Sequence, residues 1–481
     1  MINDVLNSVQ TGAYNTQELE QLRKALAVGV GYTGRPTDLV GAGVLQMESL
    51  DSVLTSVTFE MKDLVFWGSV PMDKAESNVE EYNRKIGQGA EEQSPYIIEG
   101  GAGQENDSLY IRDVQTVALF CEKRKVTDIA TLVKTSMDME AEAVTSGTMS
   151  LLKSVERECY RGSAYFCDAT GAQTGSNGDL PLNLIHLRGL YKQILQADTD
   201  ERYYSRDFVG YGIESLSSIK DLEGKTIAQD DVEESATVAR INFGFPKELH
   251  SEIGALSAFA KQFYPIFRSQ PGLSGATVGY DVSKVTTTAG VIDLKPNNFL
   301  QPEARVRPSA SNPRSPLTSG LSIAGAAAGS GSKMLAGNYH YAIKLINDFG
   351  ESAPIFTSAP VAVTAGQEVT ITITGTIPSG TKFFKLYRAD GSAASTAQFI
   401  GNYQLSIAGS IKDIGSKKPG LGEAYLLDFR PSCIKFKQLL PLSKKNLATV
   451  ATAKEFLILL YGMLIVYSPK FCGVMKNVAN R

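Results

Sequence analysis

The chain has 481 residues, of which 43% are hydrophobic and 20% are charged, and its formal net charge is −4. This hydrophobic content is sufficient for a sizeable core and argues against disorder throughout the chain. The near balance of 47 basic and 51 acidic residues argues against a protein that binds nucleic acid over its whole surface through positive charge. The length predicts about three compact units.

Signals for export and for membrane insertion are not expected. The first residues, Met1–Val5, are acidic where a signal peptide has a basic region. The longest apolar run, Phe456–Tyr467, is too short to cross a bilayer, which takes about 20 residues, and it predicts a strand buried on both faces. The five cysteines show no paired spacing, so we expect reduced thiols and synthesis in the cytoplasm.

The first 120 residues predict two extended parts that need external support. A capping box at Asn15–Glu18 starts a short amphipathic helix with loose Gly-rich flanks, which suits an arm packed on something else. Further on, strands at Val57–Met61 and Val114–Phe120 bracket a polar, acidic and Gly-rich segment. A long two-stranded excursion of this kind is marginal alone, and a neighbouring chain would stabilise it.

A mixed helix and strand body comes next. Apolar residues at helical spacing from Val144 to Cys159 predict a long helix over 136–161, which Gly162 ends. Between 165 and 310 helices alternate with strands, which predicts an α+β or α/β body. The expected helices are Leu182–Leu195, Ser215–Lys220 and Pro246–Gln262, and the expected strands are Val238–Phe243 and Gly290–Leu294.

The composition changes at Pro308. Ser, Gly, Ala and Pro dominate up to Ser332, which predicts a flexible linker. Apolar and polar residues then alternate in short runs separated by Gly and Pro, as in a small β-sandwich that ends near Gly422. The stretch Asn347–Pro354 resembles part of fibronectin type III or immunoglobulin-like modules. Because body-like strands resume after Tyr425, the sandwich is predicted to be an insertion.

Signatures of catalysis, cofactor binding and metal binding are sparse, and we expect none of the three. Gly29–Gly34 satisfies G-x-G-x-x-G but follows a predicted helix rather than a strand, so a hinge is favoured over a dinucleotide site. The acidic runs Asp198–Glu201 and Asp230–Glu234 favour solvated surface over a cation site. The basic run Glu122–Lys125 favours a solvated or intersubunit role over phosphate contact. The three histidines, expected on the surface or satisfied in the core, are His186, His250 and His340.

The order of these parts resembles the major capsid protein of tailed bacteriophages, which has the Hong Kong 97 fold. Individual stretches also resemble parts of such proteins. The start of an extended loop resembles Lys62–Pro71 and Ser77–Asn83, and a spine helix resembles Thr145–Arg157. The end of such proteins resembles Gln438–Leu442, Phe456–Gly462 and Pro469–Asn477. The resemblance implies an α+β capsid fold with an inserted all-β sandwich. The implied parts are an N-terminal arm (1–56), an extended loop with flanking strands (57–120), a peripheral domain with the spine helix (121–174 and 441–481), an axial domain (175–307 and 423–440), and a linker plus immunoglobulin-like sandwich (308–422).

This resemblance implies a structural protein that assembles into the hexamers and pentamers of an icosahedral phage head around double-stranded DNA. Its implied partners are other copies of itself, scaffold, portal and decoration proteins, and nonspecifically the packaged DNA, with no membrane. The implied location is the virion, after assembly in the host cytoplasm. Encapsulin shells share the fold, but the insertion and the arm favour a phage. The candidate intersubunit contacts are Phe66, Trp67, Tyr82, Arg84, Lys85, Tyr96 and Arg112.

Two other functions stay open at this point. A surface- or carbohydrate-binding protein could act through the sandwich, although repeated sandwiches and an export signal would then be expected. An enzyme with an accessory sandwich would need a catalytic constellation, which the sequence does not show.

Overall fold

The fold is that of a computed structural model. The structure describes residues 58–89, 96, 99–101, 107–132, 138–162, 187–199, 203, 216–263, 282–302, 305–307, 314–347, 350–381, 383–391, 393–404, 410–447 and 452–480. The chain divides into two units, 1–57 with 133–138 and 58–132 with 139–481, and all described helices and strands belong to the second. The predicted arm helix, the Gly29–Gly34 motif and His186 lie outside the described residues.

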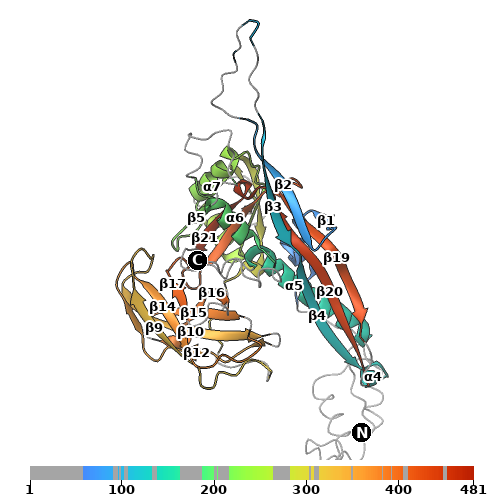
Figure 1. The fold of residues 1–481 in the computed structure, drawn as a ribbon, viewed down its shortest axis with the longest axis vertical. Coiled ribbons are helices and arrows are strands. Elements are labelled where there is room, and N and C mark those ends of the chain that lie inside the picture. The colour runs from blue at the N-terminus through green and yellow to red at the C-terminus, as the bar shows by residue number, and fades with distance from the viewer. Residues whose placement is uncertain are drawn as a thin grey trace, which may run out of the picture. The chain divides into compact units, whose positions relative to one another are not determined.

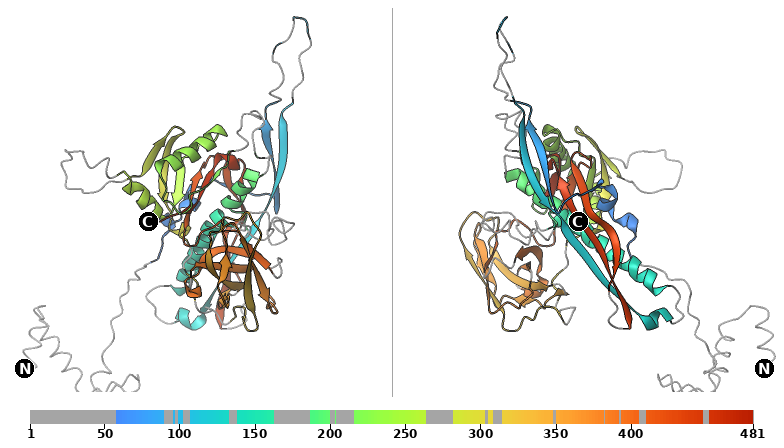
Figure 2. Two further views of the ribbon diagram at one scale, coloured as in Figure 1. Left: turned by 90° about the vertical axis from the view of Figure 1, so that its left-hand side faces the viewer. Right: turned by 45° about the vertical axis from the view of Figure 1, so that its right-hand side comes forward.

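The extended loop is a two-stranded hairpin. Strand β2 (Val79–Gly87) pairs antiparallel with β3 (Leu109–Thr116), from Val79 opposite Thr116 to Gly87 opposite Leu109. The two strands run side by side in both views of Figure 2. The predicted two-stranded excursion is therefore confirmed.

The approach to the hairpin differs from the prediction. No strand forms at the described end of Val57–Met61; instead the 3₁₀ turn η3 (Met61–Asp63) and the short helix α3 (Val65–Ser69) occupy this part, followed by β1 (Met72–Lys74). Leu64 and Phe66 are buried, so the segment is shaped by its contacts with the body rather than by strand pairing.

A four-stranded sheet lies beside the hairpin, in the order β1-β19-β20-β4. Its long strands are β4 (Ala118–Thr127), β19 (Ile434–Asn446) and β20 (Ala453–Val466), and the short helix α4 (Asp128–Leu132) follows β4. The predicted buried strand at Phe456–Tyr467 is confirmed as β20. The predicted long helix is confirmed as α5 (Met139–Arg161), which packs on β4 and β20 (Figure 1).

A second, six-stranded sheet has the order β5-β21-β18-β6-β8-β7. Its central strand β18 (Gly422–Leu427) lies between β21 and β6 and is buried along its whole length. The other strands are β5 (Ile219–Asp221), β6 (Glu248–Ser251), β7 (Lys284–Thr287), β8 (Gly290–Pro296) and β21 (Gly473–Val478). The accompanying helices and turns are α6 (Leu190–Thr199), α7 (Gln229–Ile241), α8 (Ile253–Lys261), η9 (Asn298–Leu300) and η11 (Pro469–Phe471).

Several element predictions in this region are wrong. The segment expected as a strand at Val238–Phe243 is the end of α7, because Val232, Ala236 and Ala239 are buried at helical spacing. Ser215–Lys220 was expected to be helical, but its described end begins β5. Pro246–Gln262 divides into β6 and α8, and α6 begins later than the helix expected at Leu182–Leu195.

Residues 322–413 form two further sheets that share one apolar core, which includes Tyr341, Ile371 and Phe384. The predicted linker is wrong for β9 (Ser322–Ala328), which pairs with β14. The immunoglobulin-like identity of this unit, here called the module, stays a prediction. Its other elements are β10 (Gly337–Asn347), β11 (Gly350–Glu351), β12 (Ile355–Phe356), β13 (Val361–Val363), β14 (Glu368–Thr374), β15 (Phe383–Asp390), η10 (Ala394–Thr396), β16 (Gln398–Gln404) and β17 (Ser410–Asp413).

Membrane-spanning helices and clustered metal ligands are both missing from the described part of the chain. No helix there is long and apolar enough to span a membrane. The same residues contain no group of three or more His, Cys, Asp or Glu side chains placed to hold a metal ion.

Candidate functional site

The root of the hairpin is fixed by one buried carboxylate. Glu156 of α5 accepts hydrogen bonds from the backbone N–H of Phe66 (2.8 Å) and of Trp67 (2.9 Å), at the start of α3. It also accepts one from the Asn297 side chain at 2.8 Å. Burial raises the pKa of this carboxyl above its usual value, although the three donors oppose the shift. Glu156 therefore ties the segment that leads into the hairpin to the long helix.

The same network continues into the six-stranded sheet. Asn297 also donates to the Tyr160 hydroxyl at 3.1 Å, and that hydroxyl lies 2.6 Å from Nδ1 of His250. Nε2 of His250 lies 2.8 Å from the Glu248 carboxylate. Burial lowers the pKa of His250, which favours the neutral ring. His250 is thus a satisfied core residue.

A second polar cluster holds the base of the hairpin. Asp113 of β3 accepts hydrogen bonds from Arg84 (2.6 Å), from the Tyr203 hydroxyl (3.0 Å) and from the Tyr82 hydroxyl (3.3 Å). The Arg84 guanidinium also stacks 3.9 Å from the centre of the Tyr203 ring. Arg84 is only 9% exposed. Tyr82 and Arg84 therefore anchor the hairpin to their own chain.

Apolar contacts complete this anchor. Ala75, Val117, Met463 and Ile465 form a small buried cluster under the hairpin base, and Tyr82 packs against it. The rings of Tyr82 and Tyr467 meet edge to face at 5.1 Å. The near end of the hairpin is consequently part of the folded body.

The opposite face of the hairpin is exposed and contains large apolar side chains. Val79 is 43% exposed, Tyr110 66% and Val114 41%. Between them, Arg112 forms an ion pair with Glu81 at 3.1 Å. A two-stranded ribbon gains little stability from such a face alone, whereas a partner surface would bury it.

The seven predicted contact residues divide into two groups. Phe66 is fully buried against Tyr160 and Phe429, so it belongs to the core of this chain. Trp67 is partly buried and packs on Phe436. Tyr82 and Arg84 face inward, toward the cluster around Asp113. The remaining residues, which face outward, are Lys85, Tyr96 (89% exposed) and Arg112.

Reasoning from the sequence missed Tyr110 and Val114 on this outward face. The two-residue alternation of Tyr110, Arg112 and Val114 was the available signal, because residues at this spacing share one face of a strand. The expected strand began only at Val114, so the alternation was not used.

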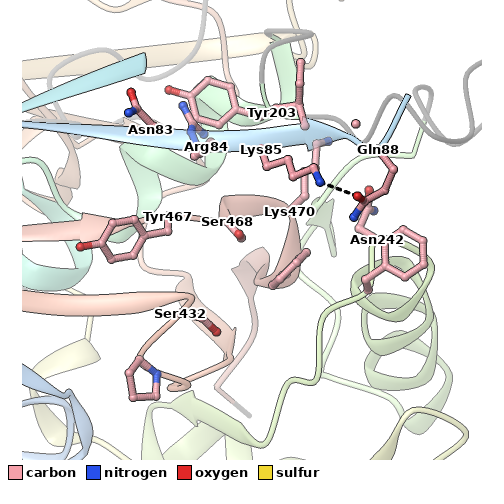
Figure 3. Close-up of a pocket in the computed structure, with 15 residues that line it drawn as sticks. Asn83, Arg84, Lys85, Gln88, Tyr203, Asn242, Ser432, Tyr467, Ser468 and Lys470 are labelled. Atoms are coloured by element: carbon pink, nitrogen blue, oxygen red, sulfur yellow. Dashed lines mark hydrogen bonds between the residues drawn. The ribbon is translucent and has the colours of Figure 1, made fainter. Parts of the chain in front are cut away.

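A pocket of about 480 Å³ lies where the hairpin leaves the body. Figure 3 shows Lys85 hydrogen-bonded to Gln88 on the hairpin side, with Ser468 and Ser432 across the space. The lining includes Arg84, Lys85 and Lys470 but, among the described residues, no Asp or Glu. Lys470 is held by Asp198 at 2.6 Å. Because Arg84 and Lys470 are paired with Asp113 and Asp198, the pocket presents amides, hydroxyls, aromatic rings and the positive charge of Lys85.

The charged runs considered as ligand sites are engaged within the chain. Lys123 and Lys125 both pair with Glu455, at 2.7 and 3.5 Å. In the run Asp230–Glu234, Asp231 pairs with Lys220 at 2.9 Å. These contacts agree with a solvated surface on which the charges pair with one another within the chain.

Comparison with known proteins gives relatives along almost the whole chain, although no family model matches it. The chain is 22% identical over 482 residues to a protein of Enterococcus phage phiEF24C, with 96% of each chain covered. It is 21% identical over 480 residues to the major capsid proteins of Staphylococcus phages S25-3 and K, covering 97% of this chain and 96% of theirs.

The comparison with solved structures also returns capsid and encapsulin chains. The capsid of cyanophage P-SCSP1u gives a TM-score of 0.45 at 9% identity, covering 93% of this chain and 97% of that one. The encapsulin of Synechococcus elongatus gives 0.40 at 10% identity, covering 91% and 95%. The assignment rests on the sequence relatives.

The relatives are similar end to end, and none of their names favours a carbohydrate-binding protein or an enzyme. The α+β class expected from the sequence is present in the structure. The chain is therefore a homologue of the major capsid proteins of phages, which confirms the resemblance and the structural capsid role predicted from its sequence.

Proposed function

We propose that this chain forms the hexamers and pentamers of an icosahedral phage head that encloses double-stranded DNA. In this shell the hairpin β2–β3 lies over a neighbouring subunit, and the long helix α5 with the four-stranded sheet forms the peripheral wall. The six-stranded sheet belongs to the axial domain around the capsomer centre.

The observation that carries this proposal is the contrast between the two faces of the hairpin. Its inner face contacts the rest of the chain through Asp113, which accepts a hydrogen bond from Tyr203, and through Tyr82, whose ring packs on Tyr467, so the base is held in place. Its outer face leaves Tyr110 and Val114 largely exposed. Burying apolar surface of this kind contributes roughly 25 cal/mol per Å², and repeated contacts around a shell sum to a large stabilisation.

The other partners that we propose are those of a capsid protein. We expect scaffold and portal proteins during assembly in the host cytoplasm, and decoration proteins on the finished virion. The net charge of −4 suits a wall that contacts packaged DNA weakly and without sequence preference.

Electron microscopy of the purified full-length protein tests the proposal, alone and co-expressed with its phage partners. Closed particles are expected. A variant in which 86–109 is replaced by Asn-Gly, joining Lys85 to Tyr110, retains the Arg84–Asp113 anchor and should stay folded by circular dichroism but form no shells. Normal shells from this variant would contradict the proposed task of the hairpin.

A further inference from the structure

An exposed apolar patch lies beside the pocket, just after the end of α7. Ile241 is 38% exposed, Phe243 48% and Phe245 40%. Phe243 also lines the pocket, together with Phe471 and Lys85. Three large apolar side chains exposed within five positions are a feature often used for protein contacts.

The backbone of Phe243 is held in a conformation that disfavours its side chain. Its φ is +69°, in the left-handed region. Its N–H donates to the Arg240 carbonyl at 2.9 Å and that of Gly244 to the Ala239 carbonyl at 2.8 Å, which ends the helix. Glycine is the usual residue at this position, directly after the C-cap Asn242, because it has no Cβ to clash. A strained position that keeps a half-exposed aromatic ring is typical of a functional surface.

The patch has a positively charged rim. The guanidinium of Arg240 stacks 3.8 Å from the Phe245 ring centre, and that of Arg430 lies 4.6 Å from the same ring. Arg430 also lies 5.6 Å from the Phe471 ring of the pocket. Arg430 is already paired with Asp428 at 2.5 Å, so a partner's carboxylates would face Arg240 and, on the hairpin side, Lys85. The surface therefore favours a partner that combines carboxylates with apolar groups.

One segment of the chain has this composition. Between Ile86 and Ile111 there is no Lys or Arg, whereas the segment contains Tyr96, Ile97 and Ile98. Its acidic residues are Glu91, Glu92, Glu99, Glu105 and Asp107. Opposite charge and matching apolar content thus relate this loop between β2 and β3 to the patch.

We propose that the loop between β2 and β3 of a second copy docks on the patch formed by Ile241, Phe243 and Phe245, with its carboxylates toward Lys85 and Arg240. The inference rests on the proposed function, since it needs copies to assemble. It adds the receiving surface and the chemistry of the contact.

Carbodiimide cross-linking tests the contact directly. Particles are assembled from a mixture of ¹⁵N-labelled and unlabelled full-length chains, treated with a water-soluble carbodiimide that joins a lysine amine to a carboxylate, and analysed by mass spectrometry. We expect Lys85 joined to an acidic residue of 91–107 in peptides of mixed label. Mixed-label links of Lys85 to other segments only, or no such link at all, would overturn the proposal. A formaldehyde cross-link of Lys85 to DNA in place of the protein link would overturn it as well.

Two variants separate docking from folding. Phe243→Gly relieves the backbone, so its unfolding midpoint should be unchanged or higher, while the yield of closed particles falls at least tenfold. Lys85→Glu should lower the yield similarly, and Glu91→Lys with Glu92→Lys in the same chain should restore it. Leu335→Ala and Lys261→Glu, which change exposed residues outside the patch, are the matched controls.

Normal particle yield from both Phe243→Gly and Lys85→Glu would refute the docking surface. Failure of the unmodified protein to form particles, with or without its phage partners, would instead refute the proposed function.

Discussion

The carboxylate of Glu156 accepts a hydrogen bond from the backbone N–H of Phe66, which lies 90 positions earlier in the chain. This contact joins the C-terminal half of the long helix α5 to the short helix that leads into the hairpin. Because Glu156 is fully buried, the geometry of the hairpin root depends on one charged group and its three donors.

Replacing this carboxylate should destabilise the fold. In Glu156→Gln the amide nitrogen must face one of the donors from Phe66, Trp67 or Asn297, so a buried N–H is left unpaired. Such a loss costs about 1–3 kcal/mol, measured by urea unfolding at neutral pH. Glu140→Gln on the surface of the same helix is the control and should leave the unfolding midpoint nearly unchanged.

The same variant should change the pH dependence of stability. Burial raises the folded-state pKa of Glu156, so between the usual carboxyl pKa and this raised value the folded protein binds more protons than the unfolded chain. Its contribution to stability is therefore largest at acid pH and falls as the pH rises through the raised pKa. Glutamine does not titrate, so the stability difference between the two proteins should shrink as the pH rises above the usual carboxyl pKa of about 4.3. A constant difference over this range would mean that Glu156 does not titrate there.

Close packing of α5 on the sheet gives a second prediction. A Cβ added at Gly147 would lie 2.6 Å from Cδ1 of Ile458 and 3.1 Å from Cγ of Arg124. Gly147→Val should therefore lower the unfolding free energy by about 1–3 kcal/mol through overpacking. Thr145→Val, at an exposed position of the same helix, should have a much smaller effect. Equal effects of the two substitutions would contradict close contact at Gly147.

Sequence patterns were sufficient to predict the helices and strands whose structure is determined by their own residues. The apolar stripe from Val144 to Cys159 was sufficient for α5, because one face of a long helix packs on the sheet. The run Phe456–Tyr467 was sufficient for most of β20, since both of its faces are buried.

Other parts depend on residues far away in the chain. Phe66 was predicted to be a subunit contact, but its burial depends on Glu156, Tyr160 and Phe429, which no local pattern around it reveals. The segment Val238–Phe243 has the β-branched and aromatic residues of a strand, yet the buried spacing that extends from Val232 makes it helical as far as Ile241. Tertiary packing overrides local propensity in both cases.

The buried ion cluster around Glu423 provides a third prediction. Glu423 of β18 pairs with Lys417 (3.2 Å) and Arg161 (3.3 Å) and accepts a hydrogen bond from the Tyr425 hydroxyl at 2.8 Å. Although burial opposes it, the two cations lower the pKa of Glu423 to about 2. Glu423→Gln leaves both cations without their carboxylate and should cost about 3–5 kcal/mol.

The loss of folding stability at acid pH tests the same cluster. A depressed pKa stabilises the fold above the usual carboxyl value, and this contribution is lost as the pH falls from about 4.5 toward 2. Glu423→Gln should reduce the slope of stability against pH in that range, whereas the surface control Glu234→Gln should retain it. An unchanged slope in Glu423→Gln would show that Glu423 is not the group responsible.

The last prediction concerns where the module can be removed. On the far side of β17 the chain returns to the six-stranded sheet through Lys417, which pairs with Glu423, and Lys418, whose N–H donates to the Asn477 side chain at 2.8 Å. Gly422 is already the first residue of β18. Replacing 315–416 by a short Gly-Ser link keeps these contacts, so the body should fold and form particles.

A longer deletion, 315–422, removes Lys417, Lys418 and the start of β18, and should be the less stable of the two by about 3 kcal/mol or more, because Glu423 loses a buried partner. Urea unfolding of both proteins, with electron microscopy of their assemblies, distinguishes the cases. If both deletions abolish folding equally, the module is required for the body to fold and is not an autonomous insertion. If the shorter one alone assembles, the residues from Lys417 onward belong structurally to the capsid body.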